Sequence, residues 1–370
     1  MVKHHMTASR RKKLLLNAEP FGFGPTAAVA TVFPEISPYV IEIGYIGEGH
    51  TLDLQKTLGY DRVIDCTGYR EAEIMRKMKD YDIFFTALDF RMAGLARAAG
   101  LRVIIYDPLT WYWRETPPII ASVDLYIAQD FFGVRERIGD HPDCFGRAVI
   151  VSPIVIPQKR TTTGNEVLLN LGGLLNPFWS FEDTVTYARK MIRLVRESLS
   201  RHETLTIATG HSVRAALHDP TVGTYSVHEI RALMSRSSYA IMTPGLGNIY
   251  DAAGFDLPTL WLPPANDSQG QQLQRLEGSG MTDEYLDWPT LSQGMKKIDY
   301  TATQTFVLEQ IAGMVRHLDD QDEELRCSVQ KAIDGVRSRE HSRTRELITR
   351  FGAGGSTDIA TIIHERDMFV

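Results

Sequence analysis

Residues 235–281 read SRSSYAIMTPGLGNIYDAAGFDLPTLWLPPANDSQGQQLQRLEGSGM, and this stretch decides which fold the chain is expected to adopt. An apolar run at 239–242 ends in TPGLGN (243–248), and a short helical pattern follows it. A second apolar run at 259–262 leads into another helical pattern from Gln269. Strand, glycine-rich turn, helix and a further strand in this order are typical of a parallel α/β sheet.

The same alternation continues on both sides of this stretch, through most of the chain. In the second half we expect further strands at 166–171 and 204–208, and helices at 184–199, 227–235 and 247–253. In the first half we expect strands at 13–18, 39–43, 62–65, 83–86, 102–106, 125–128 and 149–152, and helices at 25–33, 71–78 and 91–99. Continuous apolar strands separated by helices indicate parallel sheets covered on both faces.

The segment PIVIPQKRTTTGN (153–165) interrupts the alternation with two prolines, a basic pair and three threonines. We interpret it as a linker, because 370 residues exceed one ordinary core. The predicted fold class is α/β, with two Rossmann-like domains facing a cleft and a helical C-terminal tail. The predicted domains are 1–157, 158–310 and 311–370, and part of the last is expected to pack back on the first.

Glycines at the start of the helix in the quoted stretch predict an anion site. Gly245 and Gly247 leave backbone N–H groups uncovered at the helix N-terminus, where the helix dipole also favours an anion. Thr243 and Asn248 flank these glycines. Asp251 follows one turn later, where its carboxylate could accept hydrogen bonds from the ribose next to bound phosphates.

This arrangement resembles the nucleotide-sugar site of GT-B glycosyltransferases. The resemblance is strongest to the family that contains the lipid-linked N-acetylglucosaminyltransferase of peptidoglycan synthesis and the UDP-glycosyltransferases of natural products. That family has an acidic residue seven positions before a proline, as Asp251 stands before Pro258 here. Its sugar-contacting loop is matched by Asp267, Gln269, Gln271 and Gln272. The chain departs from the family by having Asp instead of Glu, TPG at the opening of the turn, and the added residues Phe255 and Asp256.

Two other turns of the second half belong to the donor site that the resemblance implies. Gly172 and Gly173 follow a strand, although a tight strand-to-helix turn would explain them equally well. In TGH (209–211), His211 is expected to touch the phosphate or base of the donor, or else to be an ordinary surface histidine. The donor is expected to be a UDP-sugar that serves as cosubstrate, with no cofactor.

The loop EPFGFGPTA (19–27) after the first strand supports two interpretations. In the GT-B interpretation, Glu19 is the general base, and Phe21, Gly22, Phe23 and Gly24 bind the acceptor. In the alternative, Gly22, Gly24 and Ala27 form a G-x-G-x-x-A dinucleotide fingerprint with Glu42 as the ribose-binding acid. Three residues, 19–21, separate the strand from Gly22, which weakens this NAD interpretation.

Other acceptor-side candidates follow later strands of the first half. Asp89 and Asp107 are rival bases, since both are expected at carboxyl ends of strands. Trp111 and Trp113 lie in the aromatic loop YDPLTWYWR (106–114). They would either stack on a flat acceptor or sugar face, or pack over the core as buried aromatic residues commonly do.

Composition limits the possible partners and compartments. The net charge of −6 argues against nucleic-acid binding, and the basic residues Arg10–Lys13 are interpreted as a solvated arm. The three widely spaced cysteines indicate a reducing compartment without structural zinc. No apolar run could span a bilayer and no secretory h-region is seen, so a cytoplasmic protein without an integral membrane segment is expected. The helical tail from Thr301 could brace the first domain, or its Glu/Arg-rich end, 337–350, could form a homodimer contact.

The predicted activity is inverting, metal-independent hexosyl transfer from a nucleotide sugar to a small-molecule acceptor. No Asp-x-Asp metal motif is present, although sequence leaves retaining chemistry open. The stretches NAEPFGFGP (17–25) and NLGGLLNPF (170–178) resemble cytosylglucuronate synthases of nucleoside-antibiotic pathways, which implies UDP-glucuronate, a pyrimidine base and a possible carboxylate partner in Arg275. A sugar-nucleotide 2-epimerase of the same fold, an NAD-dependent oxidoreductase and an inactive binding module are the alternatives.

Overall fold

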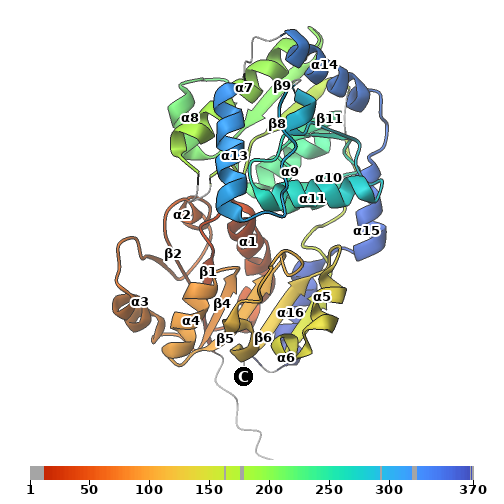
Figure 1. Ribbon diagram of the computed structural model, residues 1–370. Helices are drawn as coiled ribbons and strands as arrows, with labels where there is room; N and C mark the ends of the chain where they lie inside the picture. Colours follow the sequence, from red (N-terminus) through yellow and green to blue (C-terminus); the bar gives the residue numbers. More distant parts are fainter. Residues whose placement is uncertain are drawn as a thin grey trace, which may run out of the picture. The chain divides into compact units, whose positions relative to one another are not determined.

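The computed structural model describes residues 12–161, 164–175, 179–291, 294–318, 323–366 and 368 (Figure 1). Arg10 and Arg11 of the basic run and residues 176–178 of the second resembling stretch lie outside these ranges. The chain forms two compact units. One contains the described residues up to Pro20, Pro25–Ser152 and the chain from Gly354, and the other contains Phe21–Gly24 and Pro153–Ala353.

The first unit is built on a seven-stranded sheet in the order β3-β2-β1-β4-β5-β6-β7, in which every neighbouring pair is parallel. Its strands are β1 (Lys13–Ala18), β2 (Glu42–Gly47), β3 (Arg62–Asp65), β4 (Ile83–Ala87), β5 (Arg102–Asp107), β6 (Leu125–Gln129) and β7 (Ala148–Val151). All residues of β4 and β6 are buried, as expected for strands covered on both faces, including the polar Thr86 and Gln129.

Helices cover this sheet. They are α1 (Gly24–Ile36), α2 (Thr51–Gln55), α3 (Glu71–Met78), α4 (Phe90–Ala98), α5 (Val134–Asp140), α6 (Pro142–Phe145) and α16 (Gly355–Glu365), with the 3₁₀ turns η1 (Ser37–Tyr39) and η2 (Pro118–Ser122). The last helix, α16, joins the first unit next to β7, where Asp358 accepts a hydrogen bond from the Ser152 backbone N–H at 3.2 Å. The end of the described chain therefore completes the unit that its beginning starts.

The second unit has a six-stranded parallel sheet in the order β10-β9-β8-β11-β12-β13. Its strands are β8 (Glu166–Asn170), β9 (Thr204–Ala208), β10 (Val222–Gly223), β11 (Tyr239–Met242), β12 (Thr259–Trp261) and β13 (Glu284–Tyr285). Its helices are α7 (Phe181–Ser198), α8 (His211–Leu217), α9 (Val227–Arg236), α10 (Leu246–Gly254), α11 (Asp267–Gly278), α12 (Trp288–Leu291), α13 (Gln304–His317), α14 (Glu323–Arg337) and α15 (Glu346–Phe351), with η3 (Arg343–Arg345) before the last.

One hydrophobic core of the second unit lies between its sheet and the helices α7, α13 and α14. The amphipathic α7 contributes Tyr187, Met191 and Val195 to it. At its edge, Glu203 accepts two hydrogen bonds of 2.8 Å from Arg337 of α14 and one of 2.7 Å from the Tyr239 hydroxyl. These contacts fix α14 to the sheet and lower the pKa of Glu203.

The strand order places the functional loops. In the first sheet the winding direction reverses between β1 and β4, and in the second it reverses between β8 and β11. Loops that leave such neighbouring strands diverge to opposite faces and leave room for a ligand outside the carboxyl ends of the strands. The loops after β1 and β4, and separately those after β8 and β11, are therefore the favoured ligand positions of the two units.

Several predicted elements are wrong in detail. The strand expected at 39–43 is β2 at Glu42–Gly47, because Ser37–Tyr39 forms the 3₁₀ turn that Pro38 favours at its start. The two-residue strands β10 and β13 were not predicted, since they are too short to show an alternating pattern. The α/β class and the two parallel sheets are confirmed.

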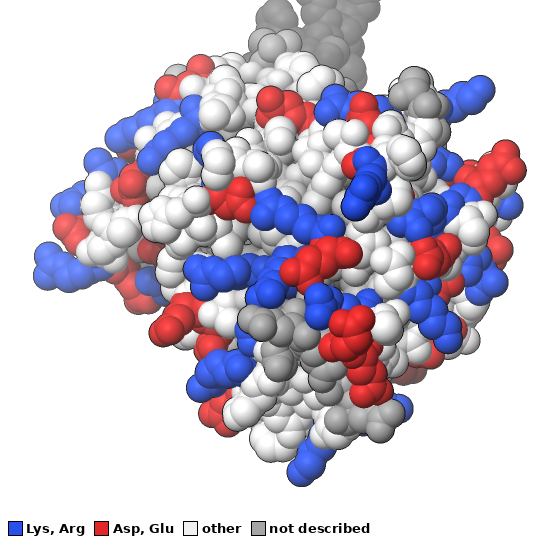
Figure 2. Space-filling model, turned by 90° about the horizontal axis from the view of Figure 1, so that it is seen from above, with Lys and Arg blue, Asp and Glu red and all other residues white. Residues whose placement is uncertain are grey.

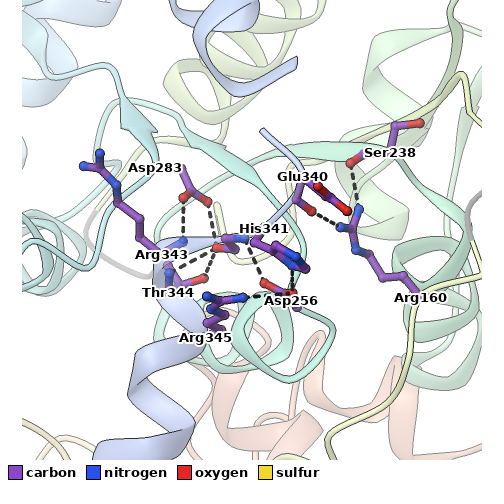
Figure 3. Close-up of polar contacts among 10 residues, drawn as sticks. Arg160, Ser238, Asp256, Asp283, Glu340, His341, Arg343, Thr344 and Arg345 are labelled. Carbon is purple, nitrogen blue, oxygen red and sulfur yellow. Dashed lines mark hydrogen bonds and ion pairs between the residues drawn. The ribbon is translucent and has the colours of Figure 1, made fainter. Parts of the chain in front are cut away.

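Two of the segments where the chain passes between the units, which follow Ser152 and precede Gly354, are fastened within the second unit near the C-terminal end of α10. Figure 3 shows the polar contacts of Arg160, Asp256 and Asp283 that hold them. From the segment at 153–161, Gln158 N–H donates to the Gly254 carbonyl at 2.9 Å. Arg160 donates to the carbonyls of Ser238 at 2.9 Å and of Glu340 at 2.6 Å. Because Glu340 belongs to the second joining segment, Arg160 links the two.

Two aspartates hold that second joining segment. Asp256 accepts from the His341 ring at 2.5 Å and from the Ser342 backbone N–H at 2.8 Å. Asp283 accepts from the Ser342 hydroxyl and the Arg343 backbone N–H, both at 2.7 Å. We call these contacts the Asp256–Asp283 clasp (Figure 3). Several arginines of segment 337–350 are thus engaged within the chain, and its role as a homodimer contact stays a prediction.

Candidate functional site

The turn between β11 and α10 gives the second unit its clearest ligand-binding feature. Gly245 is the N-cap of the nine-residue helix α10, and Gly247 lies in its first turn. Apart from the adjoining backbone, no atom of the described residues lies within 4 Å of the position that a Cβ would take on either glycine. The backbone at the start of α10 is therefore open on the side where a side chain would point, which is the geometry that lets an anion approach helix N–H groups.

The flanking side chains predicted to bind the donor are engaged in holding two turns together. Thr243 donates through its hydroxyl to the Gly172 carbonyl at 2.7 Å. Asn248 donates to the Thr243 carbonyl at 3.0 Å and accepts from the Asn170 amide at 3.2 Å. Asn170 in turn accepts from Gly172 N–H at 2.9 Å. This network fixes the Gly172–Gly173 turn beside the start of α10. Thr243 and Asn248 therefore hold the two turns of the candidate site together.

Asn170 is a site residue that sequence analysis missed. It is the last residue of β8 and is 5% exposed. Asn17 has a similar place in the first unit. It directly precedes the last residue of β1 and is 1% exposed. Asn17 accepts from the Thr86 hydroxyl at 2.6 Å and donates to the Ile46 carbonyl at 3.0 Å. A polar amide that ends an apolar LLN run in both halves was the available signal.

Asp251 lies on α10 and is paired with Arg231 of α9, with 3.3 Å between Arg231 Nε and Asp251 Oδ1. Its side chain is only 18% exposed. Burial raises the pKa of Asp251, and the guanidinium of Arg231 opposes that shift. The second carboxylate oxygen has no hydrogen bond to Arg231 in this arrangement, so the predicted acceptance from ribose hydroxyls is compatible with the ion pair.

The polar loop after β12 is largely engaged in its own structure. Asn266 caps α11 by accepting from Gln269 N–H at 2.9 Å, and Gln269 accepts from Ala265 N–H at 2.9 Å. Gln271 donates to the Tyr300 carbonyl at 2.9 Å. Asp267 is 3% exposed. These contacts favour a loop-shaping role for Gln269 and Gln271, whose predicted sugar contacts stay predictions.

His211 is the first residue of α8 and is exposed, directly after the buried Gly210. Arg275 lies on α11 and is half-buried. Neither position tests the predicted contacts with the donor base or with a uronate carboxylate.

In the first unit, Glu19 and Asp89 follow the neighbouring strands β1 and β4. Glu19 N–H donates to the Ala87 carbonyl at 2.9 Å, which extends the pairing of the two strands by one residue. Asp89 is 6% exposed and caps α4 by accepting from Met92 N–H at 2.9 Å. Between β4 and Asp89, Leu88 has φ 69°, a left-handed conformation that non-glycine residues adopt at a cost. Strained backbone of this kind is often found at functional loops.

The pKa values of this pair are raised, which is compatible with the predicted role as a general base. Burial and then the neighbouring Asp89 and Glu48 raise the pKa of Glu19 to about 8. Burial raises the pKa of Asp89 to about 6, while the Met92 N–H, Arg91 and a hydrogen bond from Asn17 oppose that shift. Carboxyl groups with pKa values this close to neutrality can take up a substrate proton.

Glu48 was missed because β2 was placed four residues too early. It follows the carboxyl end of β2, next to Gly47. Glu42, predicted as the ribose-binding acid of a dinucleotide fold, instead begins β2 and forms an ion pair with Lys13 at the start of β1. Glu42 therefore lies at the amino ends of the parallel strands, whereas the loops after β1 and β4 leave from their carboxyl ends. The NAD interpretation therefore loses Glu42 as its ribose ligand.

Asp107 supports the aromatic loop. It is fully buried and accepts from Leu109 N–H at 2.6 Å, the Trp113 indole at 2.6 Å and the Tyr126 hydroxyl at 2.5 Å. Burial raises the pKa of Asp107 to about 6, and these donors oppose the shift. Three donors on one buried carboxylate favour a structural role for Asp107 over the predicted role as base.

The two tryptophans of this loop differ in exposure. Trp111 is 6% exposed and packs on Phe131 with 5.4 Å between ring centroids. Trp113 is partly exposed and meets Phe90 edge-on at 5.2 Å. Trp113 is thus the better placed of the two for the predicted stacking on an acceptor.

The described part of the chain also bears on metal, membrane and polyanion binding. No group of three or more His, Cys, Asp or Glu residues within it is arranged to hold a metal ion. None of the helices within the same residues is long and apolar enough to cross a membrane. On the face shown in Figure 2, Lys and Arg alternate with Asp and Glu, without the broad single-sign area that a polyanion requires.

No protein-family model and no curated protein matches the chain. Solved structures match nearly its whole length. S. aureus MnaA in a co-structure with UDP has a TM-score of 0.52 at 12% identity, covering 96% of this chain and 97% of that one. Acinetobacter baumannii MurG has a TM-score of 0.50 at 13% identity, covering 96% and 98%. LpCGTa in complex with UDP has a TM-score of 0.50 at 11% identity, covering 95% and 98%. The chain therefore has the GT-B fold.

Proposed function

We propose that this chain transfers a sugar from a UDP-type nucleotide donor to a small-molecule acceptor. The observation that carries the proposal is the open helix start at Gly245 and Gly247, fixed beside the Gly172–Gly173 turn by Thr243 and the two asparagines. A helix start of this kind favours an anion, and it lies at the carboxyl ends of neighbouring strands, where ligands of open α/β sheets bind. Two of the structures that share the fold contain UDP.

The proposed mechanism divides the work between the two units. Glu19 of the first unit removes the proton of the acceptor nucleophile, and its raised pKa suits that step. The acceptor atom then forms a bond to the anomeric carbon while the bond from that carbon to the diphosphate oxygen breaks. The N–H groups at the start of α10 stabilise the negative charge that develops on the departing nucleoside diphosphate. One displacement of this kind inverts the anomeric configuration and requires no metal.

The more specific proposal is transfer of the glucuronate group from UDP-glucuronate to a pyrimidine base. It rests on the resemblance of the two glycine-containing stretches at 17–25 and 170–178 to cytosylglucuronate synthases. In that case Arg275 of α11 would pair with the uronate carboxylate.

A calorimetric screen of UDP, dTDP, GDP and NAD tests the nucleotide class. We expect heat of binding with UDP and none with NAD. Tight NAD binding without any response to the diphosphonucleosides would overturn the proposal. If UDP binds, the screen is extended to UDP-sugars with and without cytosine as acceptor. Turnover of UDP-N-acetylglucosamine alone would identify an epimerase instead of a transferase.

Asp251→Ala is expected to raise the dissociation constant for UDP at least about tenfold, because a charged hydrogen bond to the ribose contributes roughly 1.5–3 kcal/mol. Asp219→Ala is the matched control, since Asp219 of the same unit is also paired with an arginine, Arg196, at 2.7 Å. The control should bind UDP as the wild type does. Equal affinity in the Asp251 variant, measured by calorimetry, would reject the ribose role.

A further inference from the structure

The loop Phe21–Gly24, predicted to serve the acceptor, is part of the second compact unit. Gly22 N–H donates to the Leu175 carbonyl at 2.8 Å. Gly22 has φ +58°, and a Cβ there would lie 3.5 Å from Gly173 Cα and from the Gly173 carbonyl oxygen. The left-handed conformation at Gly22 therefore brings the backbone of this loop onto the Gly172–Gly173 turn.

Phe23 reaches a second turn of the same unit. A Cβ on Gly210 would lie 2.9 Å from Phe23 Cε2 and 3.3 Å from Cζ, with Leu175 Cδ1 at 3.9 Å. Gly210 has φ −67° and ψ 155°, which any residue adopts. Glycine is thus not needed at 210 for the backbone conformation. A methyl group at 210 would instead displace the phenyl ring, which occupies the place of a side chain there.

Both turns lie where a ligand of this sheet is expected. The Gly172–Gly173 turn follows β8 and Gly210 follows β9, and these strands are paired neighbours. The carboxyl ends of adjacent parallel strands are the ligand side of an open α/β sheet. A nucleotide bound against these two turns meets the ring of Phe23.

We propose that Phe23 is a donor-binding residue, whose ring, seated on Gly210, forms the wall on which the base of the nucleotide stacks. The inference rests on the proposed nucleotide-sugar function and assigns the loop Phe21–Gly24 to the donor instead of the acceptor. A phenyl ring suits this role because every nucleobase offers a flat π face.

The test is UDP binding to the full-length chain by calorimetry, without acceptor. Stacking of a base on an aromatic ring contributes roughly 1–3 kcal/mol, so Phe23→Ala should raise the dissociation constant about tenfold. Gly210→Ala should also weaken binding, about threefold or more, because its methyl group displaces the ring. In the Phe23→Ala background the same Gly210→Ala change should have no further effect. Phe306→Ala removes a 50% exposed phenyl group of the same unit and should leave affinity unchanged.

The outcomes separate the two proposals. If the wild type binds UDP and Phe23→Ala binds it equally well or more tightly, the role of Phe23 is rejected while the nucleotide-sugar function stands. Additive effects of the Phe23 and Gly210 changes would also reject it, because the ring must transmit the effect of the methyl group. A wild type that binds no diphosphonucleoside would overturn both proposals. Matching melting temperatures for all variants exclude misfolding as the cause.

Discussion

Glu19→Gln is expected to lower the turnover number about 10²–10⁴-fold, the usual contribution of a positioned general base. The amide has nearly the volume of the carboxyl group but cannot take up the acceptor proton. In the wild type the rate should rise with pH up to about 8, the pKa to which burial and the neighbouring carboxylates bring Glu19. The variant should lack this rising limb. Steady-state kinetics with a UDP-sugar from pH 5 to 9 make the comparison.

The same substitution is expected to stabilise the protein. The pKa of Glu19 is raised from 4.5 to about 8 in the folded state, so folding favours the protonated form. Its stabilising effect is complete below pH 4.5 and is lost as the pH rises through about 8. Glutamine does not ionise, so the variant should gain on the wild type by up to roughly 1.4 kcal/mol per pH unit across that window. Thermal unfolding at several pH values measures the difference.

Glu48→Gln serves as the control for both measurements. Glu48 is exposed and raises the pKa of Glu19 through its charge. Its removal should shift the rising limb of the rate to lower pH while most of the maximal rate remains. A Glu19→Gln variant that keeps the wild-type rate and pH profile would contradict the assignment and leave Asp89 as the base.

Asp283→Ala is expected to destabilise the second unit by about 3 kcal/mol or more. The carboxylate is 5% exposed and accepts from Thr259 N–H at 3.0 Å, besides its two contacts in the clasp. Its loss leaves several buried donors without an acceptor, and each such donor costs roughly 1–3 kcal/mol. Thermal unfolding should show the loss, and the amides of Thr259 and Arg343 should exchange faster with deuterium.

Asp65→Ala is the matched control, since Asp65 is an exposed carboxylate with a local hydrogen bond to Thr67 N–H at 3.0 Å. Its loss should cost less than about 0.5 kcal/mol. Unchanged exchange at Thr259 and Arg343 in the Asp283 variant would show that other contacts hold the segment.

The fold could be predicted from the sequence because parallel strands covered on both faces contain unbroken apolar runs. LLL in β1 and VII in β5 are examples. The bounds of β2 were predicted wrongly because its sequence, EIGYIG, contains two glycines and a charged first residue. The space over Gly44 is filled by the Tyr81 ring, which no local pattern reveals.

The candidate site was predictable only in part. Glycines at a helix start can be found from spacing, because the strand before them is apolar and the turn is short. Hydrogen-bond and ion-pair partners that come from distant segments cannot be found in this way. Arg231 lies 20 residues before Asp251, and Thr86 lies 69 residues after Asn17. Their pairing depends on strand order and helix packing, which a local window does not contain.

The clasp also decides where the chain can pivot. α10 is a rod of about 13 Å with the open glycines at one end and both joining segments pinned at the other. Pinned residues such as Arg160 and Ser342 are poor places for torsional change. Backbone torsions change more easily in the residues outside these hydrogen-bonded positions. There the second segment has glycines with φ +83° at Gly352 and +85° at Gly354. These two glycines are therefore the positions in that segment where a change of backbone torsion costs least.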